Sequence, residues 1–163
     1  MRRKPSLLCA CILLVISSIT RAQDVPAFAD CAATVQSTSR RPVLKFADAR
    51  ARKYRGVLRD ATNGPVNFAG HYVLAEWGCG SGCVMAAVID KISGRVTSLP
   101  FSVSDWPLDV TEPLQYRADS CLLIVQGSRN ESREHGRYYY SFDGAVFRLT
   151  VERLLDDSYH GRR

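Results

Sequence analysis

The most distinctive chemical feature of the sequence is a glycine-rich stretch with a cysteine on either side. Residues 77–83 are Trp-Gly-Cys-Gly-Ser-Gly-Cys, so that three residues separate Cys79 from Cys83. Residues that face each other across an antiparallel strand pair lie about 4.5–5.5 Å apart, which is within the Cα–Cα range of a disulfide. We therefore expect a Cys79–Cys83 disulfide that closes a hairpin turn.

Three other kinds of site compete for the same stretch. A redox pair normally has two residues between its cysteines and a thioredoxin-like βαβ pattern around them, and neither occurs here. A metal site would have to join these thiols to His71 or His135, and an oxidising compartment consumes thiols. Glycine amides can bind an anion, but no GxGxxG or GxxxxGK[ST] pattern is present. We predict no metal and no cofactor.

Histidines are the second group that could do chemistry, because a nucleophile needs a base beside it. The chain has three: His71, His135 and His160. Only His71 is expected on a strand close to the glycine-rich loop, where Glu76 and Ser81 could complete a hydrolytic site. No GxSxG, HExxH or characteristic carboxylate pair supports that function, and a strand histidine is more often structural.

The N-terminus indicates export. Residues 1–22 comprise a basic start, an apolar run over residues 7–16 and small residues that end at Ala22, which is the pattern of a cleaved signal peptide. The run is too short for a bilayer, which needs roughly 20 residues. Cleavage would remove four basic residues and no acid, and so lower the net charge from +6 to +2. The remaining four cysteines permit three pairings, of which we favour Cys79–Cys83 with Cys31–Cys121.

The remaining positive charge is concentrated in one segment. Residues 40–59 contain eight basic residues and one acid, Asp48, whereas the rest of the mature chain carries −5. Apolar residues recur at helical spacing over 44–59, and three arginines lie along one flank of the stripe: Arg52, Arg55 and Arg59. Such a basic helix could bind an anion, a lipid headgroup or an acidic partner. It could equally be a solvated helix lying on a sheet, with the aliphatic parts of its basic side chains covering apolar surface.

Beyond residue 65 the pattern becomes that of strands joined by short turns. Alternating or apolar segments lie at 66–77, 83–89, 95–101, 121–126, 137–142 and 145–155, with a shorter one at 114–117. We predict an α+β, mainly β fold: an antiparallel meander of about six strands with one N-terminal basic amphipathic helix, braced by disulfides. The domain would span 44–155, preceded by an extended segment over 23–43 and followed by a polar tail over 156–163.

Three stretches resemble a group of small exported proteobacterial proteins: residues 68–72 (Phe-Ala-Gly-His-Tyr), 77–83 and 88–96. The resemblance covers roughly residues 50–98, and in that group a basic segment similar to 51–55 precedes the first stretch. It implies a periplasmic or secreted protein of a Gram-negative bacterium and transfers no catalytic residue. It favours the matching residues as the place of any site: Gly70, His71, Trp77, Gly78, Cys79 and Cys83.

These observations predict an exported binding module that recognises another protein or an envelope component, for example an inhibitor or an immunity-type protein. Exposed aromatics at Trp106 and among residues 138–140 would serve as anchors, although alternate members of the tyrosine run must face the core. The expected contact residues are His71, Trp77, Gly78, Gly80, Arg52, Arg55, Arg59 and Tyr139. Neither nucleic acid nor a transmembrane segment is expected. The alternative is a small periplasmic hydrolase centred on His71, Glu76 and the Cys79–Cys83 loop, and it would need His71 in a cleft beside Glu76.

Overall fold

The computed structural model describes residues 25–39 and 41–155, so the predicted signal peptide and the polar tail lie outside the described residues. The elements follow one another in this order: η1 (Phe28–Cys31), β1 (Lys45–Phe46), α1 (Ala49–Lys53), α2 (Arg55–Ala61), β2 (Tyr72–Gly80), β3 (Cys83–Asp90), β4 (Arg95–Ser98), β5 (Val103–Ser104), β6 (Leu114–Gln115), β7 (Leu122–Arg129), β8 (His135–Phe142) and β9 (Phe147–Leu154).

The nine strands of the described residues belong to one sheet, in the order β1-β4-β3-β5-β7-β8-β9, with β2 paired to β3 and β6 paired to β7. The mainly β prediction is confirmed, but the expectation of about six purely antiparallel strands is wrong. β1 pairs with β4 in parallel, and all other pairs are antiparallel. β1 and β5 have two residues each, which is too short for alternation to reveal them.

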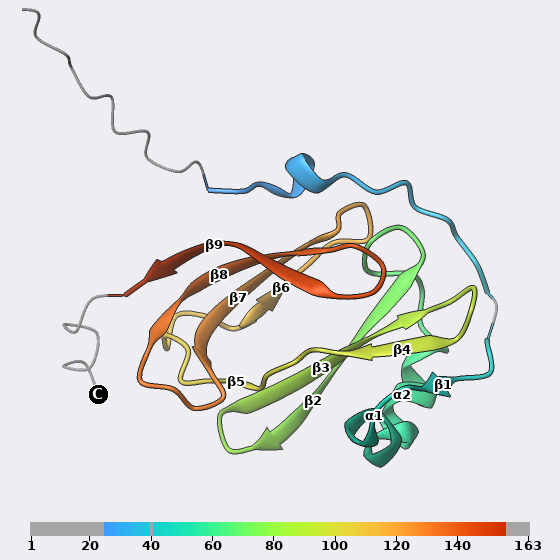
Figure 1. Cartoon of the computed structure of the whole chain (residues 1–163), viewed down its shortest axis with the longest axis horizontal. Helices are drawn as coiled ribbons and strands as arrows, with labels where there is room; N and C mark the ends of the chain where they lie inside the picture. Colours follow the sequence, from blue (N-terminus) through green and yellow to red (C-terminus); the bar gives the residue numbers. More distant parts are fainter. Residues whose placement is uncertain (1–24, 40, 156–163) are drawn as a thin grey trace, which may run out of the picture.

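The sheet folds over on itself around its largest core. One face of β2 and β3 packs against the inner face of β7 and β8, with Leu74, Val88, Leu123 and Tyr138 among the buried contacts. The opposite face of β2–β4 is covered by α1 and α2, so that the helices lie on one side of the molecule and β7–β9 on the other (Figure 1). Strand β2 therefore has a core on both faces.

The basic segment forms β1 and two short helices rather than one helix over residues 44–59. Asp48 caps α1 by accepting a hydrogen bond from the Ala51 N–H at 2.7 Å, and Tyr54 interrupts the helix with a φ of −98° and a ψ of 23°. The apolar stripe nevertheless packs as expected, because Ala51 and Leu58 are fully buried against β2–β4. The single-helix prediction failed because Lys45 and Phe46, near the start of the segment, pair in parallel with β4, and because Tyr54 leaves the helical conformation.

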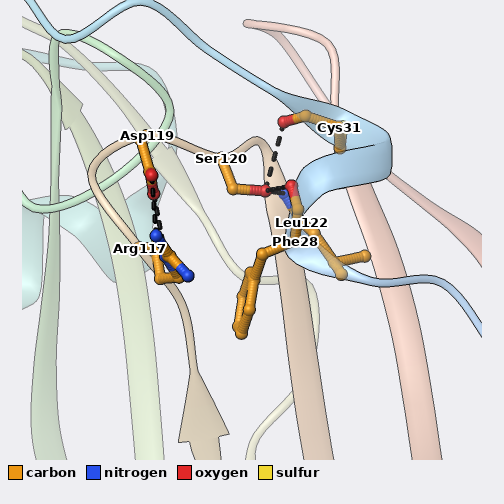
Figure 2. A network of polar contacts seen from close by, with 6 residues as sticks. All are labelled: Phe28, Cys31, Arg117, Asp119, Ser120 and Leu122. Carbon is orange, nitrogen blue, oxygen red and sulfur yellow. Dashed lines mark hydrogen bonds and ion pairs between the residues drawn. The ribbon is translucent and has the colours of Figure 1, made fainter.

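An N-terminal strap, residues 25–39 and 41–45, runs along the outside of the sheet and leads through β1 to α1 (Figure 1). Its first part is fixed by the Cys31–Cys121 disulfide, with a Cα–Cα distance of 5.3 Å. The Ser120 hydroxyl lies 2.7 Å from the Phe28 carbonyl oxygen and 3.1 Å from that of Cys31 (Figure 2). The Arg117 guanidinium is paired with Asp119 and stands 5.6 Å from the Phe28 ring centre. This end of the strap covers the outer face of β7–β9.

Candidate functional site

Strand β2 carries most of the residues that the sequence singled out. His71 immediately precedes it and lies at the corner where β3 ends. The His71 side chain is 25% exposed, its Nε2 atom is 3.6 Å from an Asp90 carboxylate oxygen, and its ring lies against Tyr72 with centroids 4.1 Å apart. Burial alone would raise the pKa of Asp90, but hydrogen bonds from the Ser93 hydroxyl and two backbone N–H groups outweigh it and lower that pKa. The Asp90 carboxylate at this corner is therefore a hydrogen-bond acceptor that the following turn holds in place.

Glu76 lies near the middle of β2, five residues from His71. At the rise of an extended strand, their Cα atoms are roughly 16 Å apart. Although Glu76 as a whole residue remains exposed, its carboxyl group is partly desolvated, and this raises its pKa. The Tyr116 hydroxyl partly offsets the rise by hydrogen bonding, and the nearby Glu112 carboxylate adds to it.

The disulfide hairpin is at the far end of β2 from His71. Cys79 and Cys83 are bonded, with Cα atoms 5.2 Å apart, so both expected disulfides are confirmed. The structure thus spreads His71, Glu76 and the hairpin along one strand instead of gathering them in a cleft. A site that needs His71 and Glu76 together is not assembled.

The aromatic residues expected as anchors are largely internal. Tyr138, Tyr139 and Tyr140 are 0%, 3% and 4% exposed, so alternate members face the core as expected, but the expectation that Tyr139 is an exposed contact residue is wrong. Tyr138 and Tyr140 face the main core, and Tyr139 is covered on the other face by η1. Both faces of β8 are buried because the sheet folds over on one side and the strap covers the other, and alternation within β8 does not reveal either covering.

Trp77 is also buried, with 9% of its surface exposed. It faces the helices and lies 4.9 Å from the Tyr54 ring. Its indole N–H has no hydrogen-bond partner within the described part of the chain. Gly78 and Gly80, in contrast, are exposed where β2 enters the hairpin.

The predicted basic contact residues, Arg52, Arg55 and Arg59, are all exposed on α1 and α2. One Arg52 guanidinium nitrogen donates to the Phe46 carbonyl at 3.3 Å. These helices lie on the outer side of the sheet (Figure 1).

A hollow of about 550 Å³ adjoins the hairpin, and sequence reasoning did not find it. Eight residues line it: Ser81, Gly82, Cys83, Ser104, Asp105, Trp106, Leu108 and Glu131. We call this the hairpin hollow. It forms because the two-residue strand β5 pairs with both the start of β3 and the end of β7, which brings the hairpin beside the segment that follows β5.

The wall of the hairpin hollow is held rigidly. The Ser104 and Ser128 hydroxyls are 3.0 Å apart in a buried hydrogen bond. Gly127 allows β5 to approach, since a Cβ atom there would collide with the Ser104 carbonyl oxygen. Asp105 then leaves β5 with a φ of 48°, a left-handed conformation that turns the chain sharply outward.

The segment after β5 carries acidic side chains together with large apolar ones. Residues 105–116 contain three acids and no basic residue. Leu108 is 95% exposed, whereas Trp106 is half-buried against the main core. In sequence this segment has prolines but no clear periodicity, so its acidic bias and Trp106 are the signals that could have indicated a site there.

Among the described residues, no group of three or more histidine, cysteine or acidic side chains could hold a metal ion. The described helices are all too short and too polar to cross a membrane. Comparisons with protein-family models, curated proteins and solved structures found no match.

Proposed function

We propose that this chain is an exported binding module whose hairpin hollow recognises a basic segment of a partner protein. The observation that carries the proposal is the nearly fully exposed Leu108 beside a rigid hollow that also contains Trp106. Exposed apolar and aromatic side chains around a preformed concavity are typical of the anchors of protein interfaces. A periplasmic or secreted setting is part of the proposal, supported by the two disulfides and by the apolar N-terminal run.

Rigidity favours binding at this place over other exposed surface. The Cys79–Cys83 bond fixes the hairpin turn on one side, and the Ser104–Ser128 hydrogen bond fixes β5 on the other. A preformed surface loses little conformational entropy when a partner binds. The acidic rim, with Asp105 and Glu131 in the lining, favours a partner that carries lysine or arginine around an apolar side chain.

The proposal is tested with the oxidised chain and three variants: Leu108→Ser, Trp106→Ala and the control Ile92→Ser. Ile92 is also an exposed apolar residue, at 46%, but it lies in the turn after β3. Immobilised protein is exposed to periplasmic extract at low and moderate salt. We expect one stoichiometric partner, bound about tenfold more weakly by Leu108→Ser because an apolar contact of roughly 1.5 kcal/mol is lost. Ile92→Ser should bind normally, and salt should weaken the complex.

Two results would contradict this function. One is a partner whose affinity is unchanged by both Leu108→Ser and Trp106→Ala. The other is the absence of any partner together with hydrolytic turnover that Glu76→Gln abolishes.

A hydrolytic function is the second candidate, and it rests on Glu76 alone. Its raised pKa and its proximity to the Tyr116 hydroxyl suit a general acid. Glu76→Gln should then abolish turnover in a panel of ester, peptide and glycoside substrates, while retention of turnover in that variant would remove this candidate.

A further inference from the structure

A buried lysine lies at the opposite end of β2 from the hairpin hollow. Lys91 directly follows β3 and is only 1% exposed. Its ammonium group donates hydrogen bonds to the carbonyl oxygens of Thr62 and Gly64, each at 2.9 Å. These carbonyls follow the end of α2, where the helix dipole also favours a cation. An ammonium has three N–H donors, so these two hydrogen bonds leave one N–H group for a further acceptor.

No carboxylate neutralises this buried charge among the described residues, since none of their ion pairs includes Lys91. Asp90, its neighbour in sequence, is engaged with His71 and the turn at Ser93 instead. Among the described residues, the hydrogen-bond partners of this buried ammonium are neutral carbonyls. A buried positive charge that no carboxylate neutralises favours the binding of an anion beside it.

Lys91 lines a hollow of about 360 Å³, which we call the strap hollow. The strap forms one wall and the connection between α2 and β2 the other. The polar side chains of the lining are those of Ser37, Thr38, Ser39, Arg41, Asn63 and Lys91. Two cations, three hydroxyls and an amide therefore surround the space, and its described lining contains no acid.

The strap is held on both sides of this hollow by two glycine turns. Before it, the Gln36 N–H donates to the Gly70 carbonyl at 2.7 Å, and a Cβ atom on Gly70 would lie 2.7 Å from the Thr34 carbonyl oxygen. After it, the Lys45 N–H donates to the Gly94 carbonyl at 2.7 Å, and Gly94 is in close contact with Val43.

Both glycines have positive φ angles, 87° at Gly70 and 77° at Gly94, which residues with a Cβ atom rarely adopt. Two glycines from the sequence motifs thus hold the strap on both sides of the hollow, and residues 37–39 and 41 line the hollow between the two turns. The backbone on both sides of the strap hollow is consequently fixed by hydrogen bonds.

We infer that the strap hollow binds a phosphate group, held by Lys91 and Arg41 with hydroxyls of the strap. A tetrahedral oxyanion has enough acceptor oxygens to meet several donors at once, whereas a carboxylate has two. The hollow is larger than a bare phosphate ion, and its volume lies in the range of small-molecule sites. The phosphate group can therefore come from inorganic phosphate or from a small phosphate ester.

The test is titration of the full oxidised chain with inorganic phosphate, glycerol 3-phosphate and, as a carboxylate control, citrate, followed by calorimetry and by amide chemical shifts. Arg41→Gln is the principal variant, because Arg41 is exposed and its replacement leaves the buried bonds of Lys91 intact. Arg133→Gln is the matched control, since it removes an exposed cation that does not line the hollow.

We expect saturable binding of phosphate with shifts at residues 35–39, 63–66 and 91, weakened at least tenfold by Arg41→Gln and unchanged by Arg133→Gln. Equal affinities for the two phosphates would identify free phosphate as sufficient, and tighter binding of the ester would identify a small-molecule phosphate. The inference is overturned if binding does not saturate, if Arg133→Gln weakens it as much as Arg41→Gln does, or if citrate binds as tightly as either phosphate. None of these results depends on the hairpin hollow.

Discussion

The two disulfides should contribute very differently to stability, because they close loops of very different length. Cys31 and Cys121 are 90 residues apart, whereas Cys79 and Cys83 are four apart. Chain-entropy arithmetic gives the long loop about 4–5 kcal/mol and the short one about 2 kcal/mol. The long bond also holds η1 over the outer face of β7–β9, so its loss should expose that cluster as well.

The variants are the double alanine replacements Cys31→Ala/Cys121→Ala and Cys79→Ala/Cys83→Ala, each of which removes two sulfur atoms. Urea unfolding is followed by tryptophan fluorescence without reductant. With a slope of roughly 1.5–2 kcal/mol per molar urea, the variant that lacks the long loop should unfold more than 1 M earlier than the one that lacks the short loop. Equal losses, or a greater loss for the Cys79/Cys83 variant, would refute the loop-length reasoning and the anchoring role of the strap.

Four further substitutions test two glycine turns and two carboxylates. Gly70→Ala should cost roughly 2–3 kcal/mol in urea unfolding, because strained backbone and a collision with Thr34 add together. Gly82→Ala, at a φ of 62° with open space around it, should cost about 1 kcal/mol. The lowered pKa of Asp90 gives stability that is complete above the unfolded pKa of about 3.9 and is lost as pH falls through the folded value, so Asp90→Asn should flatten the acid limb of a Tm-against-pH curve. The raised pKa of Glu76 works oppositely: its penalty appears as pH rises above about 4.3, so Glu76→Gln should raise Tm at pH 7 and leave it unchanged at pH 3.5.

Each comparison has an outcome that contradicts its reasoning. Similar costs for Gly70→Ala and Gly82→Ala would mean that the strap does not pack on the Gly70 turn. An unchanged acid limb in Asp90→Asn would show that the hydrogen bonds from Ser93 and Ile92 do not hold the proton off Asp90. A Tm difference for Glu76→Gln that is the same at both pH values would point to packing rather than charge.

Local sequence patterns determined the parts of this protein that depend on near neighbours. The Cys79–Cys83 hairpin follows from two cysteines around a glycine-rich turn, and the long strands β2, β3, β7 and β8 follow from apolar alternation. The buried stripe of the basic segment was also visible, because helical spacing places Ala51 and Leu58 on one face.

Tertiary structure decided everything that depends on distant segments meeting. The strap covers Tyr139 and the folded sheet covers Tyr138, so residues that look suited to an interface are core. β5 brings Trp106 and Leu108 to the disulfide hairpin through pairs too short to leave a pattern. Lys91 is an ordinary turn lysine in the sequence and becomes a buried cation only when the end of α2 and the strap close around it. Periodicity along the chain reports which face of an element is apolar, and it does not report which other segment covers that face.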